Sequence, residues 1–287
     1  MKGLTKAITD RIVEAILREA RTKFAHHNGG DEYYTQEEDV VGILTTLSEH
    51  LRGKVVYCPC DNPNTSYFYK TLHDNFGKWG LRGLYTTWMP NMSCYYDGKN
   101  EVRGRIKSGR FQDTDEFFAK CDVVITNPPF SNAQPTEMIN MIHRHGKEYI
   151  MIADRALTML QSVFNYVRNG SMRTLDRRID TFDTPEGKKA GAPAAVYTSF
   201  DTKTPFFKTG VKYDPNIHRK FDNLDAIDCG DNFNMIPDDY YGNIAVSANG
   251  GGFLRKLNND QFEIVSGIIR PKMDGKPKKR MLIRRKR

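Results

Sequence analysis

The spacing of apolar residues predicts two helices at the start of the chain. From Ile8 to Ala20 the apolar positions fall three or four residues apart, and the run ends at the turn residues between His26 and Gly30. A second helical pattern extends from Val40 to Leu51 and closes at Gly53. We therefore expect two amphipathic helices before the first strand.

From Lys54 onwards, short apolar runs typical of buried strands alternate with helical patterns. The predicted strands are 54–58, 84–88, 122–126 and 148–153, and the predicted helices are 65–76, 114–120 and 135–145. Strands separated by helix-length segments indicate βαβ units, so we expect a parallel sheet with helices on both faces. Such sheets bind ligands beyond the carboxyl ends of their strands. The loops after Cys58, Trp88 and Thr126 are therefore the places to look for chemistry.

Two stretches depart from this alternation. Residues 89–110 contain Asp97-Gly98 between aromatic and apolar residues, which predicts an inserted hairpin. Residues 184–195 are rich in Gly, Ala, Pro and Lys and have the composition of a flexible loop. Since the alternation also fades after Asn165, we place a boundary near 160. The expected domains are a catalytic one over 1–160 and a second region over 161–287.

Composition favours a globular protein without disulfides or a metal. The chain has 287 residues, of which 39% are hydrophobic and 11% aromatic, enough for a packed interior. No apolar run approaches the roughly 18 residues of a membrane span, and residues 1–21 lack a signal peptide's apolar centre, so we expect a soluble, cytoplasmic protein. The five cysteines are odd in number, and Cys58-Pro59-Cys60 has no second Cys or His pair at zinc spacing. We expect reduced thiols and no metal site.

The positive charge is concentrated in the last residues. Between Arg270 and Arg287 ten Lys or Arg stand against one acid, Asp274, so this segment carries more than the whole formal charge of +8. A block of like charge is either a solvated terminus or a surface for a polyanion. Met281 to Ile283 form a short apolar run between the charges, which predicts a strand whose flanking residues contact phosphates.

The tetrapeptide Asn127-Pro128-Pro129-Phe130 follows the predicted strand 122–126 directly. It is either a rigid turn or a catalytic loop at a strand's carboxyl end. Methylation of an amino group conjugated to a ring is difficult because the nitrogen lone pair is delocalised into the ring. Two hydrogen-bond acceptors, one on each N–H, would return that electron density to the nitrogen. The Asn127 side-chain oxygen and the Pro128 carbonyl are suitable acceptors.

The neighbouring residues support the catalytic interpretation. Consecutive prolines fix φ near −65° and hold the Pro128 carbonyl in a preset direction. The aromatic ring of Phe130 offers a face for a base, which contributes roughly 1–3 kcal/mol per stacked base. A base in a duplex reaches such a ring only after it is flipped out. The predicted catalytic residues are Asn127, Pro128, Pro129 and Phe130.

This tetrapeptide resembles the catalytic motif of amino-group methyltransferases, and the surrounding chain is similar to the EcoRI-type adenine-specific DNA methyltransferases. The matching stretches occur in order along most of the chain and are 55–63, 123–130, 197–201 and 258–265. The resemblance implies a Rossmann-like, seven-stranded α/β domain that uses S-adenosylmethionine, a C-terminal target-recognition region and double-stranded DNA as partner. It also implies a cofactor loop at Cys58 to Asp61, although the usual Gly-x-Gly is missing, and an N-terminal cofactor segment at Tyr34-Thr35.

The candidate cofactor-binding residues are Tyr34, Thr35, Cys58, Pro59, Cys60, Asp61 and Asp113. Asp113 is either a cofactor contact or a residue that caps the following helix. The strand 84–88 ends in Thr-Thr-Trp with no acid for a ribose hydroxyl, so the ribose contact is unassigned. Direct base readout has several candidates, which are Arg155, Arg173, Arg177, Arg178, Arg219 and Asn249.

Two other functions remain open from the sequence. Asn-Pro-Pro with an aromatic also suits a methyltransferase that acts on RNA or on a protein glutamine. A non-catalytic nucleic-acid-binding protein would share the basic C-terminal segment but would not need the intact motif. Assays with labelled S-adenosylmethionine and separate DNA, RNA and protein substrates distinguish the three.

Overall fold

The computed structural model describes residues 33–130, 133–184, 187–247 and 253–287. Contacts divide these residues into two compact units, of which the first comprises 33–154 and 177–202 and the second 155–176 and 203–287. The predicted helix between Ile8 and Ala20 and the candidate Asn249 lie outside the described residues. The roles expected for 1–160 and 161–287 stay predictions.

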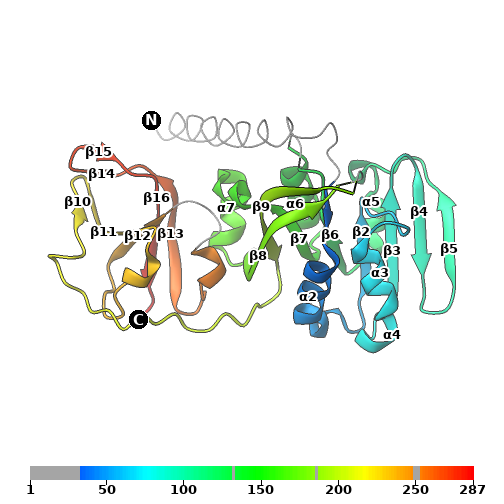
Figure 1. Ribbon diagram of the computed structural model, residues 1–287, viewed down its shortest axis with the longest axis horizontal. Helices are drawn as coiled ribbons and strands as arrows, with labels where there is room; N and C mark the ends of the chain where they lie inside the picture. The colour runs from blue at the N-terminus through cyan, green and yellow to red at the C-terminus, as the bar shows by residue number, and fades with distance from the viewer. Residues whose placement is uncertain (1–32, 131–132, 185–186, 248–252) are drawn as a thin grey trace. The chain divides into compact units, whose positions relative to one another are not determined.

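The first unit is built on a mixed sheet of nine strands in the order β1-β8-β9-β7-β6-β2-β3-β4-β5 (Figure 1). Strands β7, β6, β2 and β3 are parallel, as predicted, while β4, β5 and β9 join with antiparallel pairing. The sheet therefore has two strands more than the seven that the resemblance implied. The strands are β1 (Tyr34–Thr35), β2 (Val55–Pro59), β3 (Gly83–Trp88), β4 (Met92–Tyr96), β5 (Glu101–Arg105), β6 (Val123–Thr126), β7 (Glu148–Asp154), β8 (Arg173–Asp183) and β9 (Lys189–Thr198).

Helices precede β2 and lie between the parallel strands. They are α2 (Glu37–Leu47), η1 (Ser48–Leu51), α3 (Tyr67–Asp74), α4 (Phe76–Trp79), η2 (Phe111–Asp113), α5 (Asp115–Lys120) and α6 (Gln134–Arg144). Of these, α2, α3, α5 and α6 fall close to the predicted helices. Ser66 caps the N-terminus of α3, and its side chain accepts a hydrogen bond from the Tyr69 amide. Helix α6 carries Pro135 in its first turn, where the missing N–H costs no hydrogen bond.

The central strands are covered on both faces. All residues of β6, from Val123 to Thr126, are buried, and so are the middle residues of β7. Consecutive side chains of a strand point to opposite faces, so a strand buried at every position has packing partners on both. Helix α5 packs on β2, α3 on β3 and α6 on β7. This confirms the expectation of helices on both faces.

The predicted loop over 184–195 is wrong for most of its length. Residues 189–198 form β9, which pairs antiparallel with β7 from Ile150 opposite Thr198 to Asp154 opposite Ala194. Local composition gave no sign of this strand because its Ala, Gly and Pro residues have low strand propensity. Pairing with the buried strand β7 overrides that propensity.

The second unit contains a five-stranded sheet in the order β10-β11-β12-β16-β13. Its elements are η3 (Arg155–Met159), α7 (Gln161–Arg168), β10 (Lys220–Phe221), β11 (Leu224–Gly230), η4 (Phe233–Met235), β12 (Asn243–Ser247), η5 (Leu254–Lys256), β13 (Phe262–Ile269), β14 (Lys272–Met273), β15 (Lys276–Pro277) and β16 (Arg280–Arg285). Strand β16 contains Met281 to Ile283, which confirms the predicted C-terminal strand. Across both units, none of the helices that the structure describes is long and apolar enough to cross a membrane.

Candidate active site

A cavity of about 720 Å³ lies in the first unit, at the carboxyl ends of β2, β3 and β6. That is where a parallel sheet is expected to hold its ligand, and its size suits a small-molecule site. Residues from the predicted catalytic loop, cofactor loop and N-terminal segment meet here. The predicted residues that line it are Tyr34, Thr35, Cys60, Asp61, Asn127, Pro128, Pro129 and Phe130.

Asn127 is held with its acceptor unused. Its Nδ2 donates to the Tyr33 carbonyl at 2.7 Å, and because a carbonyl only accepts, this contact fixes which end of the amide is nitrogen. The buried Oδ1 has no hydrogen-bond partner within the described residues. A buried acceptor without a partner costs roughly 1–3 kcal/mol. The geometry therefore presents a preset acceptor for an N–H donor in the cavity.

Phe130 belongs to an aromatic cluster beside that acceptor. Its ring centroid lies 5.4 Å from Phe182 of β8 and 5.9 Å from Tyr33. Phe182 is fully buried, and its ring meets Phe130 edge-on at 77°. Edge-to-face packing holds the Phe130 ring in place, while Phe130 itself lines the cavity.

Side chains of neighbouring strands fix the backbone of the Cys58 to Asp61 loop. The Thr86 hydroxyl donates to the carbonyls of Cys58 and Asp61, and the Thr126 hydroxyl donates to that of Pro59. Cys60 has φ 68°, in the left-handed region that glycine usually occupies. The chain thus makes its turn after β2 without the glycines that are usual there, because these hydrogen bonds hold Cys60 in an unfavourable conformation.

Asp61 is a buried carboxyl group at the wall of the cavity. It is 8% exposed and accepts a hydrogen bond from the Ser66 hydroxyl through Oδ1, while Oδ2 has no partner within the described residues. Burial raises the pKa of Asp61 to about 7, against the opposing effect of the Ser66 hydrogen bond. The hydroxyl of Thr35 is likewise buried without a partner in the described part of the chain. Both oxygens are available to a polar ligand.

The other predicted cofactor residues lie outside the cavity lining. Cys58 is fully buried, and neither it nor Pro59 lines the cavity. Asp113 is also absent from the lining and accepts a hydrogen bond from the Ser108 hydroxyl at 2.8 Å. Its neighbour Gln112 does line the cavity. The cavity is therefore lined by the residue next to the predicted one, because consecutive side chains of the short helix η2 point in different directions.

Sequence reasoning missed several residues of the site. Trp88 and Phe111 add aromatic surface, and Glu137 of α6 accepts a hydrogen bond from Gln112 Nε2 at 2.8 Å. A ribose-binding acid is expected at the end of β3. Glu137 stands elsewhere in the sequence, in a helix that follows the catalytic loop, so that expectation did not point to it. Only the contact between Glu137 and Gln112 shows that this side of α6 faces the cavity.

Glycine is required at one point of the wall. A Cβ on Gly109 would lie 2.1 Å from the Trp88 carbonyl oxygen, which belongs to rigid backbone. The Gly109 amide also donates to the Pro90 carbonyl at 2.8 Å. The close approach of these two segments brings Trp88 and Phe111 to the same cavity.

The cysteines show no sign of reactivity. All five are free thiols, and burial raises the pKa of Cys58 and of Cys60 well above the usual range. A protonated thiol is a poor nucleophile and a poor metal ligand. In the described ranges no group of three or more His, Cys, Asp or Glu is placed to hold a metal ion.

Arg177, one of the candidates for base readout, is bound within the first unit. Arg177 donates to Asp39 at 2.9 Å and to the Glu38 carbonyl at 3.2 Å. Its guanidinium occupies the space where a side chain at Gly42 would stand. Arg177 therefore fastens α2 within the first unit and is not free for a base.

The fold and site together define an α/β methyltransferase-like protein. A family model described as adenine-specific methyltransferase EcoRI matches residues 21–107. The type II methyltransferase M.EcoRI of Escherichia coli is 28% identical over 305 residues, which cover 86% of this chain and 90% of that protein. The type II methyltransferase M.MpnI of Mycoplasma pneumoniae is 26% identical and covers 88% of this chain and 86% of its own length.

These similarities confirm the predicted resemblance to the EcoRI-type adenine-specific methyltransferases, and the chain is a DNA methyltransferase. A third relative, the type II methyltransferase M.MgeORF184P of Mycoplasma genitalium, is 25% identical over 88% of this chain and 86% of its own length. A solved structure of a Pyrococcus horikoshii protein described as an RNA methyltransferase aligns at 14% identity and a TM-score of 0.33, over 56% of this chain and 79% of that one. A TM-score of that size adds nothing to the assignment.

Proposed function

We propose that the protein is a site-specific DNA methyltransferase that transfers a methyl group from S-adenosylmethionine to N6 of an adenine flipped out of duplex DNA. The observation that carries the proposal is the Asn127 amide, whose Oδ1 is buried in the cavity without a partner while the Tyr33 carbonyl fixes its orientation. That acceptor suits an exocyclic amine, which has N–H groups to donate.

The residues of the cavity fit S-adenosylmethionine. The unsatisfied oxygens of Asp61 and Thr35 suit the ammonium and hydroxyl donors of such a molecule, and Trp88 and Phe111 supply apolar surface for its adenine ring. Glu137 and Gln112 are candidates for the ribose or adenine contact that β3 does not provide. When bound, S-adenosylmethionine supplies a methyl group on a sulfonium, which needs no further activation.

The catalytic loop prepares the target amine. Asn127 Oδ1 accepts one N–H of the amine and the Pro128 carbonyl accepts the other, which draws the nitrogen lone pair out of the ring. Both acceptors are positioned before the substrate arrives, so little reorganisation is needed. Phe130 packs against the flipped base, supported by the edge-on ring of Phe182.

We assign target recognition and DNA binding to residues 161–287 and S-adenosylmethionine binding with catalysis to residues 1–160. The support for the second role is that the cavity is lined by residues 33–137. The support for the first is the basic C-terminal segment. Strands β8 and β9 lie in the C-terminal region by number and yet complete the sheet of the first unit.

Replacing Asn127 by alanine tests the proposal. Asn127→Ala should lower methyl transfer to duplex DNA by roughly 100-fold or more while S-adenosylmethionine binding survives, because the lost acceptor acts on the amine. Turnover with labelled cofactor and isothermal titration measure the two effects. Asn75→Ala, outside the cavity lining, is the matched control. Near-normal turnover of Asn127→Ala would refute the catalytic role, and wild-type labelling of RNA or protein in place of DNA would refute the substrate.

A further inference from the structure

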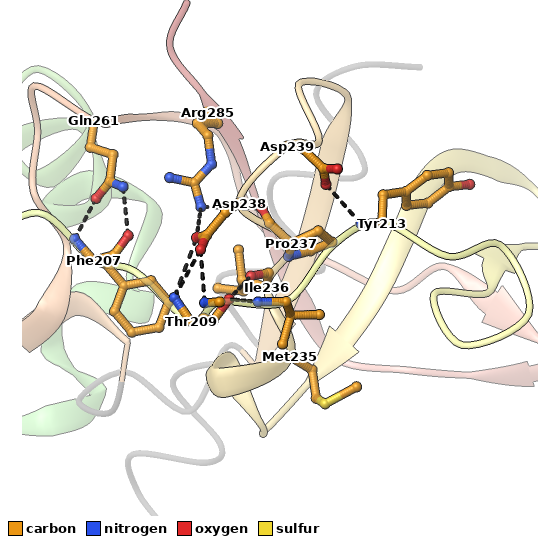
Figure 2. Close-up of polar contacts among 12 residues, drawn as sticks. Phe207, Thr209, Tyr213, Met235, Ile236, Pro237, Asp238, Asp239, Gln261 and Arg285 are labelled. Atoms are coloured by element: carbon orange, nitrogen blue, oxygen red, sulfur yellow. Dashed lines mark hydrogen bonds and ion pairs between the residues drawn. The ribbon is translucent and has the colours of Figure 1, made fainter.

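An extended segment of the second unit is held in place by side chains. Residues 204–213, here called the strap, form neither helix nor strand. Gln261 makes two hydrogen bonds to the strap at Phe207. The Phe207 amide donates to Gln261 Oε1 at 2.7 Å, and Gln261 Nε2 donates to the Phe207 carbonyl at 2.6 Å (Figure 2). This pair reproduces the two bonds that a neighbouring β-strand would make.

Two aspartates hold the rest of the strap. Asp238 accepts from the amides of Thr209 and Gly210, the latter at 2.8 Å, and Asp239 accepts from the Tyr213 amide at 2.7 Å (Figure 2). Asp238 is itself fixed by Arg285 of β16, at 3.2 Å. Carboxylates bonded to backbone amides form charge-assisted hydrogen bonds, which are stronger than neutral ones. The strap therefore has a defined conformation despite its lack of secondary structure.

This anchoring makes the two faces of the strap different. Phe207 packs at 6.3 Å from the rings of Phe233 and Phe253. The preceding residue, Phe206, is 67% exposed and has no aromatic neighbour in the described part of the chain. Lys208 and Lys212 are exposed as well, whereas Thr209 and Tyr213 are partly buried. One face serves as an anchor, and the other presents an apolar ring beside two positive charges.

The outward face carries cations that the protein does not use. Neither Lys208 nor Lys212 has a carboxylate or hydrogen-bond partner among the described residues. By contrast, the arginines of β16 are occupied, since Arg280 pairs with Asp228 at 2.6 Å and Arg284 with Glu263 at 3.1 Å. The strap thus carries free positive charge, whereas these two arginines of β16 are paired.

We propose that the outward face of the strap is a contact surface for duplex DNA, with Lys208 and Lys212 on phosphates and Phe206, on the N-terminal side of both lysines, against the adjoining sugars and base edges. This inference rests on the proposed function. Lys208 and Lys212 are four residues apart, so the extended chain between them spans at most about 14 Å. This distance is comparable to that covered by a few phosphates along one DNA strand. A fixed strap avoids the entropy cost of ordering a loop on binding. Apolar rings of this kind pack into DNA grooves in other complexes.

The double variant K208Q/K212Q tests the phosphate contacts. Each lost contact should flatten the plot of log affinity against log salt by about 0.9, so the slope of the double variant should fall by about 1.8. Between 1 M and 0.1 M salt this change amounts to roughly 60-fold weaker binding. Target and scrambled duplexes should weaken equally, because phosphates carry no sequence information. Fluorescence anisotropy at several salt concentrations measures both. The melting temperature should not change, since neither lysine has a partner to lose.

K78Q/K99Q is the matched control, because it removes two exposed lysines of the first unit and the same net charge. An equal loss of salt slope in the control would overturn the strap assignment, and so would an unchanged slope and affinity in K208Q/K212Q. In both cases DNA methylation by the wild type would still support the proposed function. A loss confined to duplex RNA would also overturn it. Failure of the wild type to methylate any duplex DNA refutes the proposed function instead.

Phe206→Ala tests the ring separately. It should weaken DNA binding by roughly 5-fold or more without changing the salt slope, because no phosphate contact is lost. Phe206→Tyr, which keeps the aromatic ring, should restore most of the affinity. Affinity equal to that of the wild type in Phe206→Ala would exclude the ring from the contact surface.

Discussion

At the scale of single residues, Asp61 should couple cofactor binding to proton release. Burial raises its pKa to about 7, so near neutrality the carboxyl group is about half protonated. A cationic ligand favours the carboxylate, so binding near pH 7 should release up to about half a proton, and affinity should fall as the pH drops below 7. Titration calorimetry in buffers of different ionisation enthalpy measures the release. Asp61→Asn should bind more weakly with no buffer dependence, and a buffer-independent wild type would contradict the coupling.

The same burial has a cost in stability. A carboxyl group whose pKa rises from 3.8 in the unfolded chain to about 7 in the fold stabilises the protein at low pH, and this contribution is lost as the pH rises through 7. Asp61→Asn should therefore raise the melting temperature at pH 8 and have little effect at pH 4. Thermal unfolding at the two pH values measures the difference. A variant less stable than the wild type at pH 8 would show that the carboxylate is satisfied in the fold.

Phe130 should act through its aromatic face. Phe130→Ala should reduce capture of the flipped base, while Phe130→Tyr and Phe130→Trp should retain partial activity because each keeps a π face. Fluorescence of 2-aminopurine at the target position reports flipping independently of methyl transfer. If Phe130→Ala flips and methylates at the wild-type level, the ring has another role.

The sequence identified the residues that do chemistry better than the residues that place them. Asn127 and Phe130 follow a recognisable strand, so their place at its carboxyl end could be predicted. The Tyr33 carbonyl that orients Asn127 is a backbone group 94 positions earlier, and no side-chain pattern marks it. The sequence favours Asp113 because it is an acid that precedes a predicted helix, yet its neighbour Gln112 is the residue that lines the cavity.

At the scale of elements, β16 is held by Arg285, one of the residues flanking Met281 to Ile283 that were expected to contact phosphates. Arg285 is 7% exposed, bonds the Pro237 carbonyl at 3.2 Å and lies 4.7 Å above the Phe262 ring. The prediction of a free phosphate contact is wrong for this residue. Charge density along the sequence could not separate it from its neighbours Lys286 and Arg287, which are exposed.

Arg285→Met should therefore destabilise the second unit. Removing the guanidinium leaves Asp238 without its ion pair, and losing one partner of a largely buried pair costs on the order of 2–4 kcal/mol. Denaturant unfolding gives the size of the effect. Arg287→Met is the matched control and should change stability by less than about 0.5 kcal/mol. Equal stabilities for the two variants would mean that the Arg285 contacts contribute nothing.

At the scale of the whole molecule, the fold of the first unit depends on residues beyond the predicted boundary at 160. Strand β9 covers the edge of β7, whose residues Ile150 to Ile152 are fully buried. A fragment ending at 160 should aggregate because that apolar edge is open, whereas a fragment ending at 202 keeps β9 and should be the more soluble. Size-exclusion chromatography and circular dichroism compare them. A folded, monomeric 1–160 fragment would contradict this dependence.

The parallel centre of the sheet could be predicted because each βαβ unit is local in sequence. The hairpin of β4 and β5 could also be predicted from Asp97-Gly98. The antiparallel pairing of β9 with β7 could not, since the chain between them passes through residues 155–176, which belong to the second unit. Local propensity carries no information about such a return of the chain. The strap was missed for a related reason, because its conformation is set by Gln261 and Asp238 rather than by its own sequence.

The late return of β9 also sets an order of events on the ribosome. Residues 155–193 must be made after β7 before Ala194 to Thr198 can pair with it. At about 5–20 residues per second, synthesis of that stretch takes several seconds. During this interval the nascent chain exposes the β7 edge, so this is the stage at which chaperones have most reason to bind it. Slower translation over 155–198 should lengthen that exposure and lower the yield of folded enzyme.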